Sequence, residues 1–251
     1  MSNYDRNGST RWGAGVARSQ GAELDQGLRA YMLGIYNHMT IGLAITAMVA
    51  LGTNMLAVTA DRHLTAFGEA IYRGPLHWVV WLAPLGFVLF FSFRLNQMSA
   101  ATARSVFYLY AATMGVFLST ILIVYTGQSI VRSLFVTAGA FGGLSLYGYT
   151  TRRDLSGMGA FLTMGLIGLI LASLVNVFTQ STGLQFALSC LTVLIFAGFT
   201  AYDTQMLKEM YYVSDDAQTA TKKSIFGALK LYLDFINIFL AVLQLTGSRN
   251  D

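Results

Sequence analysis

Seven long apolar stretches make up most of this 251-residue chain, and they restrict its fold more than any other feature of the sequence. About 20 consecutive apolar residues are needed to cross a bilayer as a helix. Only 11% of the residues are charged, whereas soluble domains contain about 25%. The sequence therefore predicts an all-α, multi-pass integral membrane protein built as a bundle of seven helices. The stretches are Tyr31–Leu56, His77–Phe93, Val106–Tyr125, Ser133–Thr150, Met158–Phe178, Leu184–Leu207 and Ser224–Leu245.

The segments between these stretches are short, so no separate soluble domain is expected. We predict a polar, mobile cytoplasmic tail over Met1–Gly27 and a seven-helix domain over residues 28–246. The tail contains no early apolar segment, which argues against a cleavable signal peptide. The single cysteine, Cys190, excludes an intramolecular disulfide and a cysteine metal cluster. The sequence has no Gly-rich phosphate loop, serine triad or zinc-ligand spacing, so we expect no cofactor.

The distribution of basic residues predicts the orientation in the membrane. Lysine and arginine are enriched on the cytoplasmic side of membrane proteins. If the N-terminus is cytoplasmic, twelve of the 16 basic residues fall on the inner side, and only Arg62, Arg73, Arg132 and Arg249 fall outside. We therefore expect a cytoplasmic N-terminus and an external C-terminus. This topology accounts for the net charge of +4, so the charge does not indicate nucleic-acid binding.

Asp203 and Asp234 are the two acidic residues inside the predicted spans. A central aspartate costs about 2.5–3.5 kcal/mol on insertion scales, and such residues usually mark an ion path, a proton relay or a paired charge. The sixth and seventh helices are antiparallel, and at 1.5 Å per residue the two carboxylates differ in depth by about 8 Å. We therefore expect them to meet and to share a proton, because two carboxylates cannot both ionise cheaply at low dielectric. Loss of that proton would create repulsion or a site for a hard cation such as Ca²⁺.

A purely structural explanation stays open beside this one. Lys230 lies four residues before Asp234 on the same helix face, so a Lys–Asp pair would lower the insertion cost without any ion conduction. Arg94, at the cytoplasmic end of the second helix, is another candidate charge partner. Asn237 and Tyr202, which lie close to the two aspartates in the sequence, are candidate polar residues lining an ion path.

Other residues of the spans are expected to serve packing and hydrogen bonding. His38, a lone histidine in the first span, is interpreted as a buried hydrogen-bonding group rather than a ligand. Small residues allow membrane helices to approach closely. On that basis we predict close helix contacts at the glycines of the fourth and fifth helices. These are Gly139, Gly142, Gly143, Gly157, Gly159, Gly165 and Gly168.

Three motifs carry a resemblance to a known family: LYGYTTRRDLSGMGAFLTMGLIGLI, FAGFTAYDTQMLKEMY and ALKLYLDFINIFLAVLQL. Together and in this order they resemble the Bax inhibitor-1 family, in particular its bacterial YccA/YbhL-like branch, over Leu28–Leu245. The resemblance implies a bundle in a bacterial inner membrane, with six helices around a central C-terminal helix. It also implies a pH-sensitive calcium leak in which Asp203 and Asp234 form the pH sensor. An arginine of the second helix, for which Arg94 is the candidate, is implied to engage Asp203 in the open form.

The resemblance leaves rival functions open. Other family members are linked to suppression of cell death and to modulation of a membrane-bound AAA protease, so a non-conducting regulator that uses Met1–Gly27 to bind partners is an alternative. A third reading is an intramembrane aspartyl protease, because Tyr202–Asp203 resembles that family's first motif. Leu231–Asp234 does not match its GxGD motif, and no Pro-Ala-Leu element occurs near the C-terminus. We therefore expect a channel for Ca²⁺, controlled by H⁺, or a regulator, rather than an enzyme.

Overall fold

The computed structural model describes residues 9–59, 61, 63–94 and 97–250, and only the backbone of residues 9–25 and 92. The described chain consists of helices with no strand apart from two isolated β-bridges, so the predicted helical bundle is confirmed. The helices are α1 (Ser9–Ala57), α2 (Ala66–Tyr72), α3 (Leu76–Arg94), α4 (Ala100–Leu118), α5 (Ile121–Val124), α6 (Gly127–Thr150), α7 (Ser156–Thr179), α8 (Thr182–Glu209) and α9 (Ala217–Thr246).

Six segments of the described chain are long and apolar enough to cross a membrane as continuous helices. One of these segments is Ala100–Val124, which combines α4 and α5. The second predicted span is the exception, because α2 and α3 meet at a bend of 55°. If this bent pair counts as one span, the number of spans is seven, as the sequence predicts.

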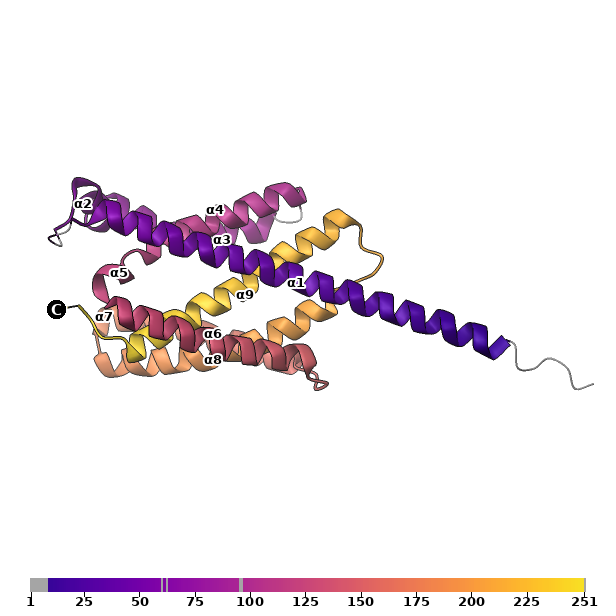
Figure 1. The fold of residues 1–251 in the computed structure, drawn as a ribbon. Helices are drawn as coiled ribbons and strands as arrows, with labels where there is room; N and C mark the ends of the chain where they lie inside the picture. The colour runs from indigo at the N-terminus through magenta and orange to yellow at the C-terminus, as the bar shows by residue number, and fades with distance from the viewer. Residues whose placement is uncertain (1–8, 60, 62, 95–96, 251) are drawn as a thin grey trace, which may run out of the picture.

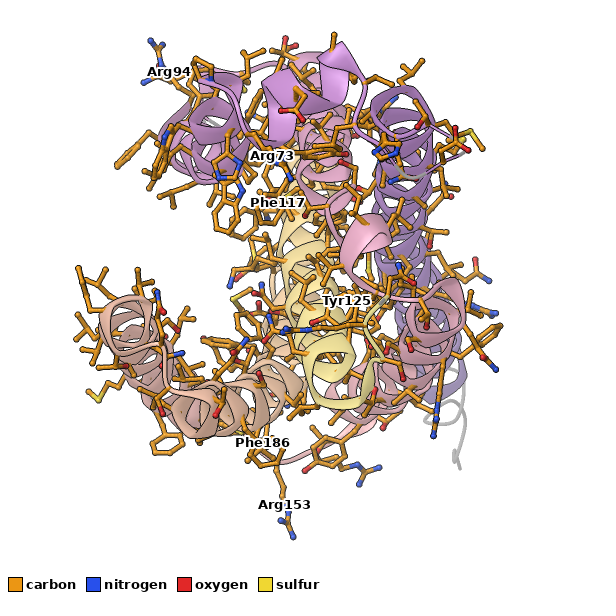
Figure 2. All side chains as sticks on the ribbon, turned by 90° about the vertical axis from the view of Figure 1, so that its left-hand side faces the viewer. Arg73, Arg94, Phe117, Tyr125, Arg153 and Phe186 are labelled. Carbon is orange, nitrogen blue, oxygen red and sulfur yellow. The ribbon has the colours of Figure 1, made fainter. Side chains whose placement is uncertain are left out.

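Helix α9 is the centre of the bundle, as the family resemblance implies. It packs against α1, α4, α6 and α8. In its most apolar part 67% of the residues are buried, compared with 11–39% in the other five continuous spans. Figures 1 and 2 show α9 between the group of α3 and α4 on one side and the group of α6 and α8 on the other, with α1 along the bundle. The side chains of α9 are therefore more shielded from lipid and water than those of the other spans.

Short polar residues begin four of the membrane helices. Side-chain oxygens of Ser99, Thr126, Ser181 and Asp216 accept backbone N–H groups at the starts of α4, α6, α8 and α9. This N-cap pairing supplies partners for amides that the helix itself leaves free. Hydrogen bonds from Thr219 and Gln218 also lower the pKa of Asp216, so this cap is charged next to the positive end of the α9 dipole.

The predicted tail, Met1–Gly27, lies partly outside the described residues. From Ser9 onward its backbone belongs to α1, which extends beyond the rest of the bundle in Figure 1. The mobility of this segment stays a prediction.

The prediction of close contacts at glycines is wrong for α6 and correct for part of α7. A Cβ atom at Gly139, Gly142 or Gly143 would meet no other atom within 4 Å. At Gly159 of α7 it would clash with the ring of Tyr202 on α8. Gly165 is also close to α8, whereas Gly157 and Gly168 face open space. Glycine spacing reveals a smooth helix face, but only the tertiary structure decides whether a neighbour or lipid covers it.

We expect Gly148→Ala to reduce stability, because α6 and α8 are in close contact at this position. A Cβ atom there would collide with the carbonyl oxygen of Ala201, which is backbone and cannot move aside alone. Overpacking of this kind typically reduces the free energy of unfolding by about 1–3 kcal/mol. Unfolding in detergent would measure it, with Gly142→Ala on the open face of α6 as the matched control. Equal stabilities of the two variants would contradict this account of the α6–α8 contact.

Candidate functional site

An ion pair between α8 and α9 forms the charged centre of the bundle. Lys230 Nζ donates a hydrogen bond to Asp203 Oδ1 at 2.9 Å. The Asp203 side chain is 4% exposed, whereas that of Lys230 is 31% exposed. The predicted i,i+4 pair between Lys230 and Asp234 is therefore replaced by a pair across two helices. Pairing of Lys230 with Asp203 is physically reasonable, because the lysine stem can keep its ammonium group near water while it reaches Asp203.

Asp234 lies one helical turn beyond Lys230 and is buried. Its Oδ2 atom has no hydrogen-bond partner among the described residues. The charges of both Asp203 and Lys230 act on it, so the three groups form one electrostatic cluster. The net charge of this cluster is zero when Asp234 is protonated and −1 when it is ionised. A buried oxygen without a partner is destabilising by about 1–3 kcal/mol, so a carboxyl at this position is not explained by stability.

Gln205 connects the AYDTQ motif to the connection between α6 and α7. Its Nε2 donates to the carbonyl oxygen of Arg153 at 2.8 Å, and its Oε1 accepts the amide of Leu155 at 2.8 Å. Within the same connection, hydrogen bonds from Ser156 lower the pKa of Asp154. The YTTRRDLS and AYDTQ motifs therefore meet in space, and their contact holds the C-terminal part of α8 against the α6–α7 connection.

Two further contacts fix α8 against α6. Thr204 Oγ1 and Ser145 Oγ are hydrogen-bonded at 3.0 Å, and Ser145 also pairs with the hydroxyl of Tyr36 on α1. Lys208 Nζ donates to the carbonyl oxygen of Tyr149, at the end of α6, at 2.9 Å. Thr204 and Lys208, which both follow Asp203 on α8, therefore bond to α6, and these contacts set the rotation of α8 about its axis.

Tyr232 anchors α9 on its opposite face. It is fully buried, and its hydroxyl is 2.7 Å from Thr46 Oγ1 on α1. Thr46 in turn donates to the carbonyl oxygen of Ala111 on α4. The rings of Phe107 and Tyr110 meet the Tyr232 ring edge-on, with centroids at 5.9 and 5.8 Å. This anchor was not predicted from the sequence, although Tyr232 lies only two residues before the costly Asp234 in a predicted span.

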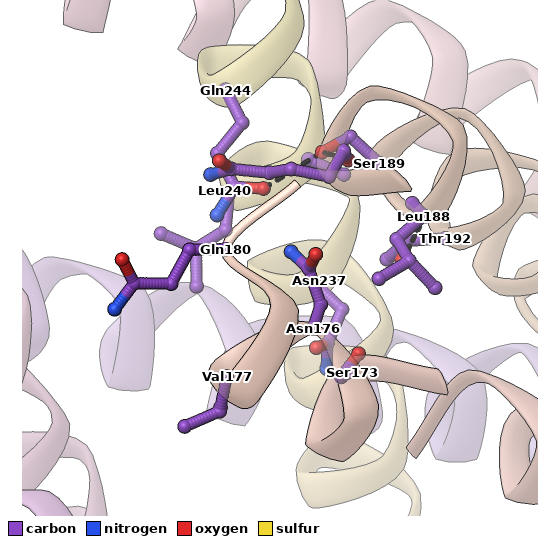
Figure 3. Close-up of a pocket in the computed structure, with 12 residues that line it drawn as sticks. Ser173, Asn176, Val177, Gln180, Leu188, Ser189, Thr192, Asn237, Leu240 and Gln244 are labelled. Carbon is purple, nitrogen blue, oxygen red and sulfur yellow. Dashed lines mark hydrogen bonds between the residues drawn. The ribbon is translucent and has the colours of Figure 1, made fainter. Parts of the chain in front are cut away.

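A polar cavity of about 500 Å³ lies between α7, α8 and α9 (Figure 3). The polar residues that line it are all uncharged: Ser173, Asn176, Gln180, Gln185, Ser189, Thr192, Asn237 and Gln244. Ser189 Oγ donates to Gln244 Oε1 at 2.8 Å (Figure 3), while Asn237 Nδ2 donates to the carbonyl oxygen of Leu233 on its own helix at 2.8 Å. A cavity lined in this way is suited to hold water within the membrane.

The cavity and the charged cluster lie along one face of α9. Lys230, Asn237 and Gln244 follow one another at intervals of seven residues, which is close to two helical turns. The structure thus places Asn237 in a polar cavity, and its role in lining an ion path stays a prediction. The seven-residue spacing was visible in the sequence, but the partners from α7 and α8 were not.

Two predicted residues are not brought to the cluster. Arg94 is exposed at the end of α3, where Nη1 donates to Gln97 Oε1 at 3.0 Å, and Figure 2 shows it at the outer edge. The reason is that α3 packs against α4, whereas α8 packs against α6, α7 and α9. Tyr202 lies against Gly159 on α7 and does not line the polar cavity, because consecutive helical residues point about 100° apart.

The remaining polar predictions have clear outcomes. His38 Nδ1 is 2.8 Å from the hydroxyl of Tyr108, so its interpretation as a hydrogen-bonding group is confirmed. Among the described residues, no three side chains of His, Cys, Asp or Glu come together to hold a metal ion. Ca²⁺ takes 6–8 oxygen ligands, so Asp203 and Asp234 would supply only part of its shell, and their binding of Ca²⁺ stays a prediction.

A family model described as "Inhibitor of apoptosis-promoting Bax1" matches residues 28–251, which include every predicted span. The chain belongs to the Bax inhibitor-1 family. Within this family it is 45% identical to the inner membrane protein YbhL of Escherichia coli (strain K12) over 227 residues, or 89% of this chain and 93% of YbhL. Protein RP147 of Rickettsia prowazekii is 43% identical over 236 residues, or 93% and 95% of the two chains. A protein of Caulobacter vibrioides is 41% identical over 244 residues, or 94% and 98%.

Membership of the Bax inhibitor-1 family and the helical spans together establish a multi-pass integral membrane protein. The similarity extends over nearly the full length of each of these three relatives. The family identification made from the three motifs is therefore confirmed.

Proposed function

We propose that this member of the Bax inhibitor-1 family is a pH-sensitive calcium leak channel of a bacterial inner membrane, with a cytoplasmic N-terminus and an external C-terminus. Asp203, Lys230 and Asp234 act as its gate. The observation that carries the proposal is the buried, unpartnered Oδ2 of Asp234 beside the Asp203–Lys230 pair. The inner-membrane location of the YbhL relative supports the proposed location.

The proposed mechanism follows from the net charge of the cluster. With Asp234 protonated, the cluster is neutral and the Lys230–Asp203 hydrogen bond ties α9 to α8. When Asp234 ionises, it competes with Asp203 for the single ammonium group and leaves one uncompensated negative charge. Either the tie between the helices weakens or a cation is drawn in. The polar cavity that reaches Asn237 provides a hydrated approach for that cation.

Calcium flux into proteoliposomes that contain a calcium dye, measured across a pH series, tests this function. At pH values below the titration midpoint of a single carboxyl group, its ionised fraction rises about tenfold per pH unit. The calcium flux should therefore rise by up to about tenfold per pH unit. Asp234→Asn should remove the pH response and leave only the low flux of the closed state. Asp154→Asn, in the exposed connection between α6 and α7, is the control and should titrate like the parent protein. Absence of flux at every pH, or an unaltered pH response in Asp203→Asn and Asp234→Asn, would refute the proposal.

A second candidate is a non-conducting regulator that binds a membrane-bound AAA protease or stress and cell-death partners. It is favoured by the extension of α1 beyond the bundle and by the structural contacts around Asp203. Deletion of Met1–Gly27 would then abolish capture of the AAA protease, whereas Asp234→Asn would not. Retained capture after the deletion would exclude this form of the regulator. A proteolytic role is less well supported, since Lys230 occupies Asp203 and Asp203 then lacks a free carboxylate for a catalytic pair.

A further inference from the structure

A groove of about 590 Å³ lies between α1 and α6, in the half of the bundle that the basic residues predict to be cytoplasmic. Both helices pack extensively against α9 but not against each other. The groove is lined by one face of α1, from Arg29 to Tyr36, and by one face of α6, from Phe141 to Tyr149. It shares no lining residue with the polar cavity or with the charged cluster.

The groove is apolar along most of its length. Met32 and Phe141 are buried at its base, whereas Leu33 and Leu146 are exposed at its edges. A Cβ atom at Gly142 would meet no other atom within 4 Å, so the α6 wall is open. In a membrane-spanning bundle, an open apolar groove of this kind faces the hydrocarbon chains of lipids.

The length of the groove fits part of one acyl chain. Arg29 and Tyr36 are seven residues apart, which is about 10 Å of helix at 1.5 Å per residue. One leaflet contributes about 15 Å to the hydrocarbon core of a bilayer. A chain that enters from the inner surface can therefore follow the groove through most of its leaflet.

Arg29 places a positive charge at the inner end of the groove. It is the fourth residue of the span that begins at Gln26, and Tyr149 is the last residue but one of the span that ends at Thr150. Both therefore lie at the boundary where lipid phosphate groups begin. Arg29 is exposed and takes part in none of the ion pairs found among the described residues.

The charges around this end favour an anionic headgroup. Lys208 Nζ lies 5.4 Å from the centre of the Tyr149 ring and adds a second positive charge. Among the described residues that line the groove, none is acidic. An arginine guanidinium group can donate two parallel hydrogen bonds to the oxygens of one phosphate group.

We propose that this groove binds one anionic phospholipid of the inner leaflet. Its phosphate group pairs with Arg29, and one acyl chain lies along Leu33, Gly142 and Leu146. The bound lipid fills the space between α1 and α6 and so holds both helices around the inner half of α9. This lipid site does not depend on the calcium leak proposed above.

The first experiment tests the headgroup. Phosphatidylglycerol or phosphatidylcholine is added to the full-length protein in a neutral detergent, and native mass spectrometry counts the lipids bound. The protein should bind one phosphatidylglycerol in preference to phosphatidylcholine. Arg29→Gln should weaken phosphatidylglycerol binding by about tenfold or more, because it removes a hydrogen bond between charged groups. Arg104→Gln is the matched control, because Arg104 is an exposed arginine on α4, which does not line the groove.

The second experiment tests the path of the acyl chain. Gly142→Leu should fill the groove and abolish phosphatidylglycerol binding, whereas Gly143→Leu should bind like the parent protein. Position 143 is equally free of neighbouring atoms but does not line the groove, so it is the matched control. Thermal unfolding without lipid should show that both variants are folded. Added phosphatidylglycerol should raise the unfolding midpoint of Gly143→Leu and of the parent, but not that of Gly142→Leu.

Three results would overturn the proposal. The first is phosphatidylglycerol binding by Arg29→Gln or Gly142→Leu that equals binding by the parent protein. The second is equal affinity of the parent protein for phosphatidylglycerol and phosphatidylcholine, since Arg29 would then have no role in selection. The third is a lipid-free dimer that Gly142→Leu disrupts, because the groove would then be covered by a second copy of the chain.

Discussion

Replacement of Lys230 with methionine should lower the free energy of unfolding by up to about 3–5 kcal/mol, because it leaves the buried Asp203 carboxylate without its ionic partner. Methionine keeps most of the length and packing of the lysine stem, so the lost charge dominates the effect. The 31% exposure of Lys230 admits some water and places the expected loss toward the lower end. Denaturant unfolding in detergent micelles would measure it.

The double-mutant cycle makes this prediction specific. Asp203→Asn alone should lower the free energy of unfolding by only about 1 kcal/mol, because the partly exposed ammonium group of Lys230 can turn toward water. The double variant Lys230→Met/Asp203→Asn should recover most of the loss, since position 203 no longer carries a buried, unpaired charge. If the two single variants are equally destabilised and their effects add, the ion pair does not control the stability of the α8–α9 contact.

Replacement of Tyr232 with alanine should lower the free energy of unfolding by about 3–5 kcal/mol, as is usual when a fully buried aromatic side chain is truncated. The change removes the edge-on contacts with Phe107 and Tyr110 and the hydrogen bond to Thr46, so it loosens α9 from α1 and α4 together. The same unfolding measurement applies.

Tyr232→Phe separates the contribution of the ring from that of the hydroxyl group. Phenylalanine keeps the ring and removes only the hydrogen bond to Thr46, so the expected loss is about 1 kcal/mol. Thr46 keeps its bond to the carbonyl oxygen of Ala111 in this variant. A loss as large as that of Tyr232→Ala would mean that the hydroxyl network, and not packing, holds α9 in place.

The seven apolar stretches of the sequence were sufficient to predict the helical membrane bundle. A bilayer provides no water to satisfy backbone groups, so a long apolar stretch that crosses it must be helical. The same physics singled out Asp203 and Asp234, because a carboxyl in a span is costly wherever it points. The second span was the exception, since the break between α2 and α3 depends on how two short helices pack.

The partners of each side chain could not be predicted in this way. Lys230 had two possible acidic partners, Asp234 on its own helix and Asp203 on the preceding one. The short sequence distance favoured Asp234 as the partner. The structure pairs it with Asp203 because contacts from α8 to α6 set the rotation of α8. Arg94 was another candidate partner because it lies at the predicted cytoplasmic end of its helix. In the structure, α3 packs against α4 and away from α8.

The sequence by itself therefore determined the number of apolar segments, their helical form, the family and the two costly carboxyl groups. Only the tertiary structure decided which glycines contact a neighbour, that Asp203 is paired while an oxygen of Asp234 is not, and where the polar cavity and the groove between α1 and α6 lie. The physical reason is that hydrophobicity and insertion cost are properties of single segments. Pairing and cavities depend on the rotation of each helix about its axis, which is set by contacts between residues far apart in the sequence.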